Sequence, residues 1–207
     1  SVAAILLVCP LLTQAQDNCS PKKFLDALAA NDLKHAGLLA SIVERPGYTD
    51  KSGVTLLMYA AEAGSADICK TLLERGADHS LQTPGGTTAL YIAAQNGHTD
   101  VVEVLLGKGA DPDIRPDNGA TALISATEYG HEEIVRLLAE HGAKTDIQDN
   151  HGSTALILAS QSGYLRIAET LIKKGADPDL ADNNGATALI LAAQEGHADI
   201  VRLLLEN

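Results

Sequence analysis

Apolar residues along this chain fall into short clusters with helical spacing, and polar residues and glycines separate each cluster from the next. From residue 49 onward the clusters repeat with a period of 33 residues. Each period holds one threonine that opens an apolar phrase, as in Thr-Ala-Leu-Ile-Leu-Ala at 154–159 and again at 187–192. The five threonines are Thr55, Thr88, Thr121, Thr154 and Thr187. A fixed period of this length indicates a stack of equivalent helical units, which favours a binding surface over a globular enzyme fold.

Residues 82–114 show the two helices that each unit is expected to contain. Thr88 can cap the first helix, because its hydroxyl accepts a hydrogen bond from a free backbone amide. Gly97 is expected to end that helix, since glycine adopts left-handed conformations without a Cβ penalty. Asp100 stands at the positive end of the second helix, and Gly109 is expected to end it. Two apolar columns recur at fixed offsets and predict the core: Leu57, Leu90, Leu123, Leu156 and Leu189, and Ile68, Val101, Ile134, Ile167 and Ile200.

Residues 21–48 lack the threonine phrase but keep apolar residues at helical spacing. A terminal layer with one polar face keeps a stack of repeats soluble, so this stretch is interpreted as an N-terminal capping helix pair. Its apolar side is predicted to consist of Phe24, Leu25, Leu28, Leu33, Leu38, Leu39, Ile42 and Val43.

These patterns divide the chain into seven segments. Residues 1–15 are interpreted as part of a signal peptide and 16–48 as the N-terminal segment with the capping repeat. Five repeats follow, at 49–81, 82–114, 115–147, 148–180 and 181–207. The closing glycine of the last repeat would fall at position 208, so that repeat is interpreted as incomplete and more protein is expected after it.

The repeated phrase resembles the ankyrin repeat, with the pattern D-x-x-G-x-T-x-L-x-x-A-x-x-x-G followed by G-A-D. The match is clearest at Asp149, Gly152, Thr154, Leu156, Ala159, Gly163, Gly175, Ala176 and Asp177. It covers about residues 49–207 and departs from the family where its usual histidine is replaced by Met58, Tyr91, Ile124, Ile157 and Ile190. The resemblance implies an all-α solenoid of stacked helix-turn-helix layers with hairpin-like turns, about five repeats plus the capping pair.

The chain is acidic, with a net charge of −12, and it contains only five tyrosines, one phenylalanine and no tryptophan. An acidic surface repels phosphate backbones and anionic lipid, so nucleic acid and membrane surfaces are disfavoured as partners. Net charge also opposes non-specific association, and the chain is expected to be a monomer on its own. Small apolar residues in place of aromatics suit thin, regular layers.

The first residues resemble the apolar part and cleavage site of a secretory signal peptide. Residues 2–12 are apolar and uncharged, and Thr13 and Ala15 are the small residues that cleavage requires. The chain is therefore expected to be a bacterial-type periplasmic or secreted protein whose signal is partly missing, with no membrane insertion in the mature form. The alternative is a buried N-terminal helix or a tail packed on the first repeat.

Two cysteines remain if the signal is removed, Cys19 and Cys69. An oxidising compartment would permit a disulfide between them. Cys69, however, aligns with Val102, Val135, Ala168 and Val201 in the other repeats, which favours a small buried apolar side chain.

No group of residues has the spacing of a catalytic or metal site. His98, His131 and His197 share one repeat column, which places them in separate layers rather than around one metal. The Asp-Pro-Asp motifs at 111–113 and 177–179 fail the calcium-loop spacing and are interpreted as turn aspartates. The glycine-rich segment 84–88 lacks a lysine for phosphate. We therefore expect no enzyme activity, no cofactor and no metal.

The residues that differ between repeats are the candidates for partner binding. In the family that the chain resembles, recognition uses the turn tips and the exposed end of the first helix. Carried over by offset from each threonine, the candidates are Gln95, Asn96, Asp117, Asn118, Glu128, Tyr129, Asn150, His151, Gln161, Ser162, Gln194 and Glu195. A plain solvated face would show the same polarity and variation. Tyr129 is the expected anchor, since tyrosine is enriched at binding hot spots.

The sequence thus predicts a non-catalytic interaction protein that binds an unidentified protein through its concave face, for instance as an inhibitor or immunity protein for a partner enzyme. The alternative is the substrate-docking arm of an enzyme whose catalytic part lies beyond residue 207.

Overall fold

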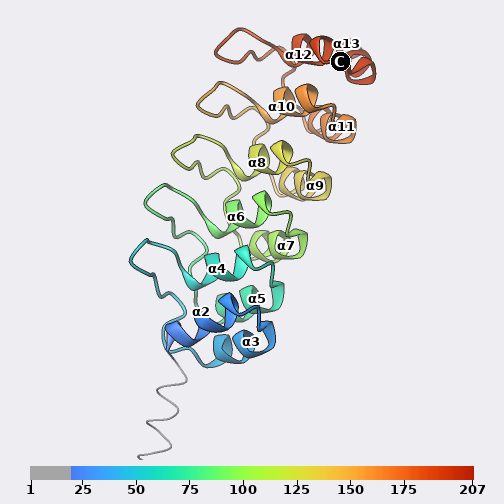
Figure 1. Ribbon diagram of the computed structural model, residues 1–207. Coiled ribbons are helices and arrows are strands. Elements are labelled where there is room, and N and C mark those ends of the chain that lie inside the picture. The colour runs from blue at the N-terminus through green and yellow to red at the C-terminus, as the bar shows by residue number, and fades with distance from the viewer. Residues whose placement is uncertain (1–19) are drawn as a thin grey trace, which may run out of the picture.

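The computed structural model describes residues 20–207 and consists of helical layers stacked in chain order (Figure 1). Twelve described helices form six pairs: α2 (Pro21–Ala29) with α3 (Leu33–Ile42), α4 (Leu56–Glu62) with α5 (Ala66–Glu74), α6 (Ala89–Gln95) with α7 (Thr99–Gly107), α8 (Ala122–Glu128) with α9 (Glu132–Glu140), α10 (Ala155–Ser162) with α11 (Leu165–Lys173), and α12 (Ala188–Gln194) with α13 (Ala198–Leu205). No strand occurs within residues 20–207. The predicted fold class, an all-α solenoid of stacked helix-turn-helix layers, is confirmed.

Each repeated threonine begins a first helix as the sequence predicts. The hydroxyl of Thr88, for example, accepts from the backbone amide of Tyr91 at 3.2 Å. The same bond recurs at Thr55, Thr121, Thr154 and Thr187. Gly97 follows the first helix with φ at +77°, and Gly109 follows the second with φ at +86°. Both glycines therefore occupy the left-handed conformation that a helix end of this kind requires.

Apolar columns that run through successive layers form the core. Leu90, Leu123 and Leu156 are at most 1% exposed, and Val101, Ile134 and Ile167 at most 2%. First helices pack on first helices of the next layer, and second helices pack on second helices. Alanines between the columns are fully buried at Ala60, Ala93, Ala126, Ala159 and Ala192. Small side chains at these points let neighbouring helices approach closely, which explains why the chain needs so few aromatic residues.

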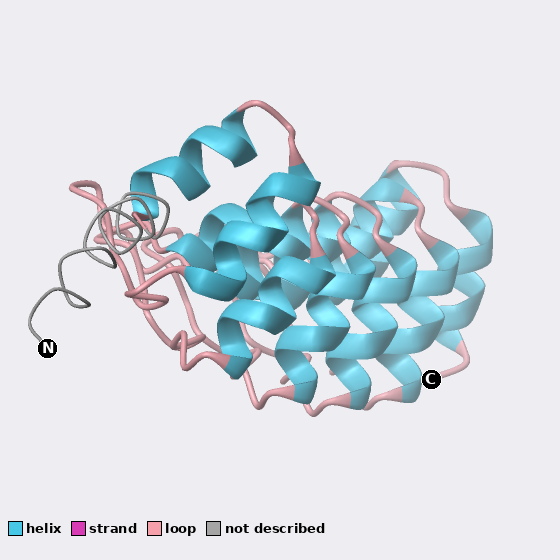
Figure 2. Cartoon of the chain, turned by 90° about the horizontal axis from the view of Figure 1, so that it is seen from below, coloured by secondary structure: helices cyan, strands magenta, loops and turns pink. Residues whose placement is uncertain are grey.

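The turns that join the pairs extend away from the helices and gather on one side of the stack (Figure 2). Each turn is short and hairpin-like, with isolated bridges at Thr49–Thr55 and Ala181–Thr187. The amide of Asp50 donates to the carbonyl of Val54 at 3.0 Å and closes the first of them. This arrangement places the turn tips next to the first helices, where partner binding is predicted.

The capping pair differs in part from its predicted apolar side. Phe24, Leu39 and Val43 are buried, at 0%, 3% and 1% exposure. Leu33, Leu38 and Ile42 were predicted to lie on the same side, but they are 38%, 62% and 44% exposed. Leu38 and Ile42 each precede a buried residue by one position, and one residue turns a helix by about 100°. They therefore face away from the layer against which α3 packs, and this part of the prediction is wrong.

Cys69 has a free thiol and is fully buried, which confirms its interpretation as an apolar core residue. Burial raises the pKa of this thiol to about 12, so it is not a reactive thiolate at neutral pH. The predicted signal peptide at residues 1–15 and Cys19 lie outside the described residues. None of the helices within residues 20–207 is long and apolar enough to cross a membrane.

Candidate protein-binding groove

A groove runs along the stack where the turn tips meet the first helices. We define it by the turn residues 117–118, 149–153 and 182–186 together with helices α8, α10 and α12. Two hollows lie in it, one near the middle of the stack and one nearer its C-terminal end. Residues far apart in the sequence line each hollow, because adjacent layers bring positions about one period apart side by side.

The first of these, the central hollow, has a volume of about 510 Å³. Ile124 of α8 and Leu158 of α10 provide an apolar floor. The polar lining includes four of the residues that the sequence predicts for partner binding: Asn118, Glu128, Asn150 and His151. The structure therefore brings these four side chains together around one opening with an apolar base.

The second, the C-terminal hollow, has a volume of about 530 Å³ and lies between α10 and α12. The predicted residues Gln161 and Gln194 line it, together with Asp182 and Asn184 of the last turn. Ser153 lines both hollows, so they share a border at the turn that precedes α10. The two openings are adjoining parts of one surface.

Two of the predicted asparagines also hold the turns in register. The side-chain amide of Asn150 donates to the carbonyl of Asp117 at 2.6 Å, in the preceding turn. Asn183 repeats the bond one layer later, donating to the carbonyl of Asn150 at 3.0 Å. Asn118 donates instead to the hydroxyl of Tyr91 at 3.1 Å. Asn118 and Asn150 therefore fix the shape of the central hollow as well as lining it.

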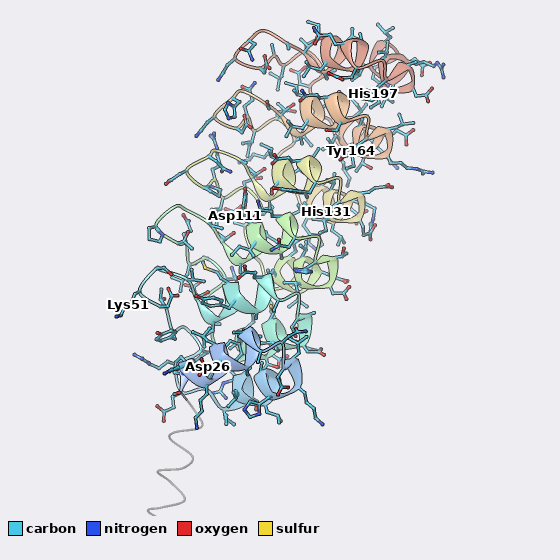
Figure 3. The ribbon with its side chains drawn as sticks, in the orientation of Figure 1. Asp26, Lys51, Asp111, His131, Tyr164 and His197 are labelled. Atoms are coloured by element: carbon cyan, nitrogen blue, oxygen red, sulfur yellow. The ribbon has the colours of Figure 1, made fainter. Side chains whose placement is uncertain are left out.

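From the second repeat onward, a column of rings links each layer to the one before it at the other end of the first helices (Figure 3). The Nε2 atoms of His98, His131 and His197 donate to the carbonyls of Glu62, Gln95 and Gln161 at 3.0, 3.0 and 3.1 Å. Tyr164 takes the histidine position in the fourth repeat and lies against Gly130. The histidines therefore have the structural role that their separate layers predict.

Tyr129 lies outside both hollows, at the end of α8 that points toward this column of rings. Its side chain is 53% exposed, and its ring stacks on that of His131 with the centroids 6.2 Å apart. Asn96, Ser162 and Glu195 occupy the same offset in other repeats and are also exposed. These four predicted residues form a row along one edge of the groove rather than its floor.

Basic side chains are distributed unevenly between the two faces of the stack, whereas acidic side chains occur on both. The first helices α4, α6, α8, α10 and α12 contain no lysine or arginine, whereas the second helices carry Lys70, Arg136, Arg166, Lys173 and Arg202. On the groove side, Asp117, Glu128 and Glu195 are exposed acids. The turn residue Arg115 uses its guanidinium to donate to the carbonyls of Gly119 and Gln148. The groove is therefore an acidic surface.

Asp50 in the first turn is held by several hydrogen bonds. One carboxylate oxygen accepts from the amide and the hydroxyl of Ser52, at 2.8 and 2.7 Å, and from the amide of Val54 at 3.0 Å. The other accepts from the hydroxyl of Tyr59 on α4 at 2.7 Å. The Ser52 hydroxyl, followed by that of Tyr59, lowers the pKa of Asp50 from 3.8 to about 2. Asp50 raises the pKa of Tyr59 in turn.

The lowered pKa of Asp50 predicts how its contribution depends on pH. A carboxyl whose pKa is lower in the folded chain stabilises the fold above its unfolded pKa and loses that effect as the pH falls toward the folded pKa. Asp50→Asn should therefore be less stable than the wild type near neutral pH, and the difference should shrink between pH 3.8 and about 2. Urea unfolding across that range measures it. A carboxyl titration by NMR should place Asp50 near 2, and Ser52→Ala should raise the midpoint; an unchanged midpoint would contradict the assigned cause.

Several groove residues were missed by the sequence reasoning. Ile124 and Leu158 form the floor of the central hollow, and Asp182 lines the C-terminal hollow. Only variable polar positions were considered as candidates for binding, so the apolar residues three and four positions after each threonine were not among them. Ile92, Leu158 and Leu191 each stand four residues after the threonine of their repeat, and they are only partly buried. Helical periodicity could have identified this offset as the groove side of the first helix.

The described residues contain no group of three or more histidines, cysteines or acids that could hold a metal ion. A model of the family described as ankyrin repeats (3 copies) matches residues 24–116, 110–182 and 152–207. No curated protein matches the chain.

Proposed function

Because the chain belongs to the ankyrin-repeat family, whose repeats are protein-interaction scaffolds, we propose that it binds a basic protein partner in its groove, outside the cytoplasm, and has no catalysis of its own. The observation that carries this proposal is the pair of adjoining hollows lined by residues within 118–158 and 153–194. Their polar lining varies from repeat to repeat over an apolar floor, and grooves of this kind are the usual ligand-binding surface of a solenoid.

The charge of the groove favours a basic partner. Acidic side chains face an approaching protein from the turns and from the first helices, and no lysine or arginine lies on those helices to oppose them. Complementary charge steers encounter and excludes partners of like charge. We further propose that binding blocks the surface of a partner enzyme, as an inhibitor or immunity protein does, and that the apolar segment at 2–12 directs export. Recovery of the tagged chain from separated cell fractions tests its location, and capture from the same fraction identifies the partner.

Glu128→Lys should mainly slow association with the captured partner. Glu128 lines the central hollow and is exposed, so reversing its charge removes part of the attraction for a basic surface. The effect should shrink as salt is added, because exposed charges are screened. Surface plasmon resonance measures both rates. Glu169→Lys makes the same change of charge on the exposed side of α11 and should leave association close to that of the wild type.

Tyr129→Ala should instead speed dissociation and weaken affinity by at least ~1–2 kcal/mol, because a large exposed ring held by His131 offers contact area at low entropic cost. The melting temperature should change little. If both variants bound the partner with wild-type rates, the interface would lie on the second helices or outside the described chain.

A further inference from the structure

A third hollow lies at the N-terminal end of the stack, between α2 and α4, and we call it the N-terminal hollow. Its volume is about 540 Å³. Leu25 and Leu28 of α2 and Tyr59 and Ala63 of α4 give it an apolar lining. It contains none of the residues that the sequence predicted for partner binding. Tyr59 and Ala63 stand four and eight residues after Thr55. Leu158 and Ser162 stand at the same two positions after Thr154, so the N-terminal hollow opens on the same side of the stack as the groove.

The N-terminal hollow exists because small residues stand where other repeats carry larger ones. Ala63 is exposed and occupies the offset that holds Asn96, Tyr129 and Glu195 in other layers. On the facing helix, Ala29 is also exposed and lines the opening. Since alanine has no side chain beyond Cβ, nothing from these two positions fills the space between the helices.

One side of the hollow is held rigid before any partner arrives. The Tyr59 hydroxyl donates to Asp50 at 2.7 Å. Asp50 is itself fixed by Ser52 and by the amide of Val54. The aromatic ring that borders the hollow therefore has little freedom left to lose on binding, which lowers the entropic cost of placing a side chain against it.

Two carboxylates border this apolar opening, Asp26 from α2 and Glu62 from α4 (Figure 3 labels Asp26). Both are exposed, and neither belongs to an ion pair found within residues 20–207. Lys22 and Lys23 lie one turn away on α2 but do not line the hollow. An apolar space between two acids on facing helices is complementary to an apolar side chain that has basic neighbours.

We propose that the N-terminal hollow receives one aliphatic or aromatic side chain of the partner, from a segment that carries lysine or arginine beside it. The apolar side chain would contact Leu25, Leu28 and Tyr59, and its basic neighbours would meet Asp26 and Glu62. This inference rests on the proposed function and adds a second contact point to it, several layers from the central hollow. A partner segment that reaches both hollows would lie along the groove in an extended form.

A displayed library of random short peptides, selected on the whole purified chain, tests the proposal. Selected peptides should combine lysine or arginine with an apolar residue close by. Ala63→Trp fills the opening from an exposed helix end and should weaken these peptides at least about tenfold in fluorescence anisotropy titrations. Glu62→Lys should weaken them as well, and less so at high salt. Ala198→Trp makes the matched change at an exposed position of α13 and should leave their affinity unchanged.

Several results would overturn the inference. The inference would be wrong if the library yielded no peptides or only peptides without basic residues. It would also be wrong if the Ala63→Trp variant bound the selected peptides as tightly as the wild type does. Equal binding of a synthetic peptide with the sequence of residues 2–12, which has no basic residue, would overturn it as well. A dimer in light scattering that Ala63→Trp dissociates would assign the hollow to a second copy of the chain. If Glu128→Lys abolished peptide binding but Ala63→Trp did not, the proposed function would stand and the role of this hollow would be wrong. If neither substitution changed the affinity for the captured partner, both the proposed function and this inference would be contradicted.

Discussion

Replacing Leu156 with alanine should lower the free energy of unfolding by roughly 2–5 kcal/mol, as truncation of a buried leucine does. Leu156 is 1% exposed and lies on α10, with a layer packed on either side. Its equivalents Leu123 and Leu189 stand in those adjacent layers. The removed atoms would leave a cavity between layers whose helices are already close, so the space has little means of collapsing.

Gln161→Ala is the matched control for this change. Gln161 lies on the same helix as Leu156, but its side chain is exposed and lines the C-terminal hollow. The substitution should alter the free energy of unfolding by no more than about 0.5 kcal/mol. Urea unfolding followed by circular dichroism compares the two variants. Equal losses would mean that the core and groove faces of α10 have been assigned incorrectly.

Gly152→Ala should also destabilise the chain strongly, by about 2–5 kcal/mol, because two costs combine at this turn. The backbone of Gly152 has φ at +80°, a conformation that L-residues adopt at a cost of roughly 1–2 kcal/mol. A Cβ there would also lie 2.6 Å from the backbone nitrogen of Asn183 in the next turn. That nitrogen donates to the carbonyl of His151 at 3.0 Å, so the clash would disturb a bond between layers.

Gly185→Ala separates the two costs. Gly185 has φ at +81°, the same conformation as Gly152, but a Cβ there would have nothing within 4 Å. Only the conformational cost of roughly 1–2 kcal/mol should appear. Thermal and urea unfolding of both variants measure the difference. If Gly185→Ala proved as damaging as Gly152→Ala, the close approach of neighbouring turns would carry no cost of its own.

Most of the fold could be predicted because the same residue types recur at the same positions in every 33-residue period. Thr88 caps a helix, Gly97 ends it, and Leu90 is buried, and each of these follows from residue type and spacing within one repeat. The capping pair has no such copies. There, helical spacing alone could not show which side of α3 would be covered, and Leu38 was assigned to the wrong side.

The candidate groove could be predicted only in part. Offsets from the threonines predicted that Glu128, Asn150 and His151 lie on one surface, and these residues line one hollow. The apolar floor of the central hollow, Ile124 and Leu158, consists of the same residue types as the core, so residue type alone could not distinguish the two. The N-terminal hollow depends on the approach of α2 to α4 and on two alanines, Ala29 and Ala63, that no pattern in the sequence distinguishes. Such a space is a property of packing between layers, which the pattern within a single repeat does not contain.

The histidine bonds between layers, and those of Asn150 and Asn183, share one property: each ends on the main-chain oxygen of a residue that is a candidate for partner binding. His98 bonds the carbonyl of Glu62, and Asn150 bonds that of Asp117. Every residue type supplies the same carbonyl, so the side chain at an acceptor position can change without loss of the bond. At acceptor positions such as Glu62 and Asp117, the side chain is therefore free to determine binding while the main-chain oxygen maintains the scaffold. A library that randomises Glu62, Gln95, Asp117 and Gln161 should therefore keep most of its members folded, and the chain could acquire new partners by successive surface substitutions while its architecture persists.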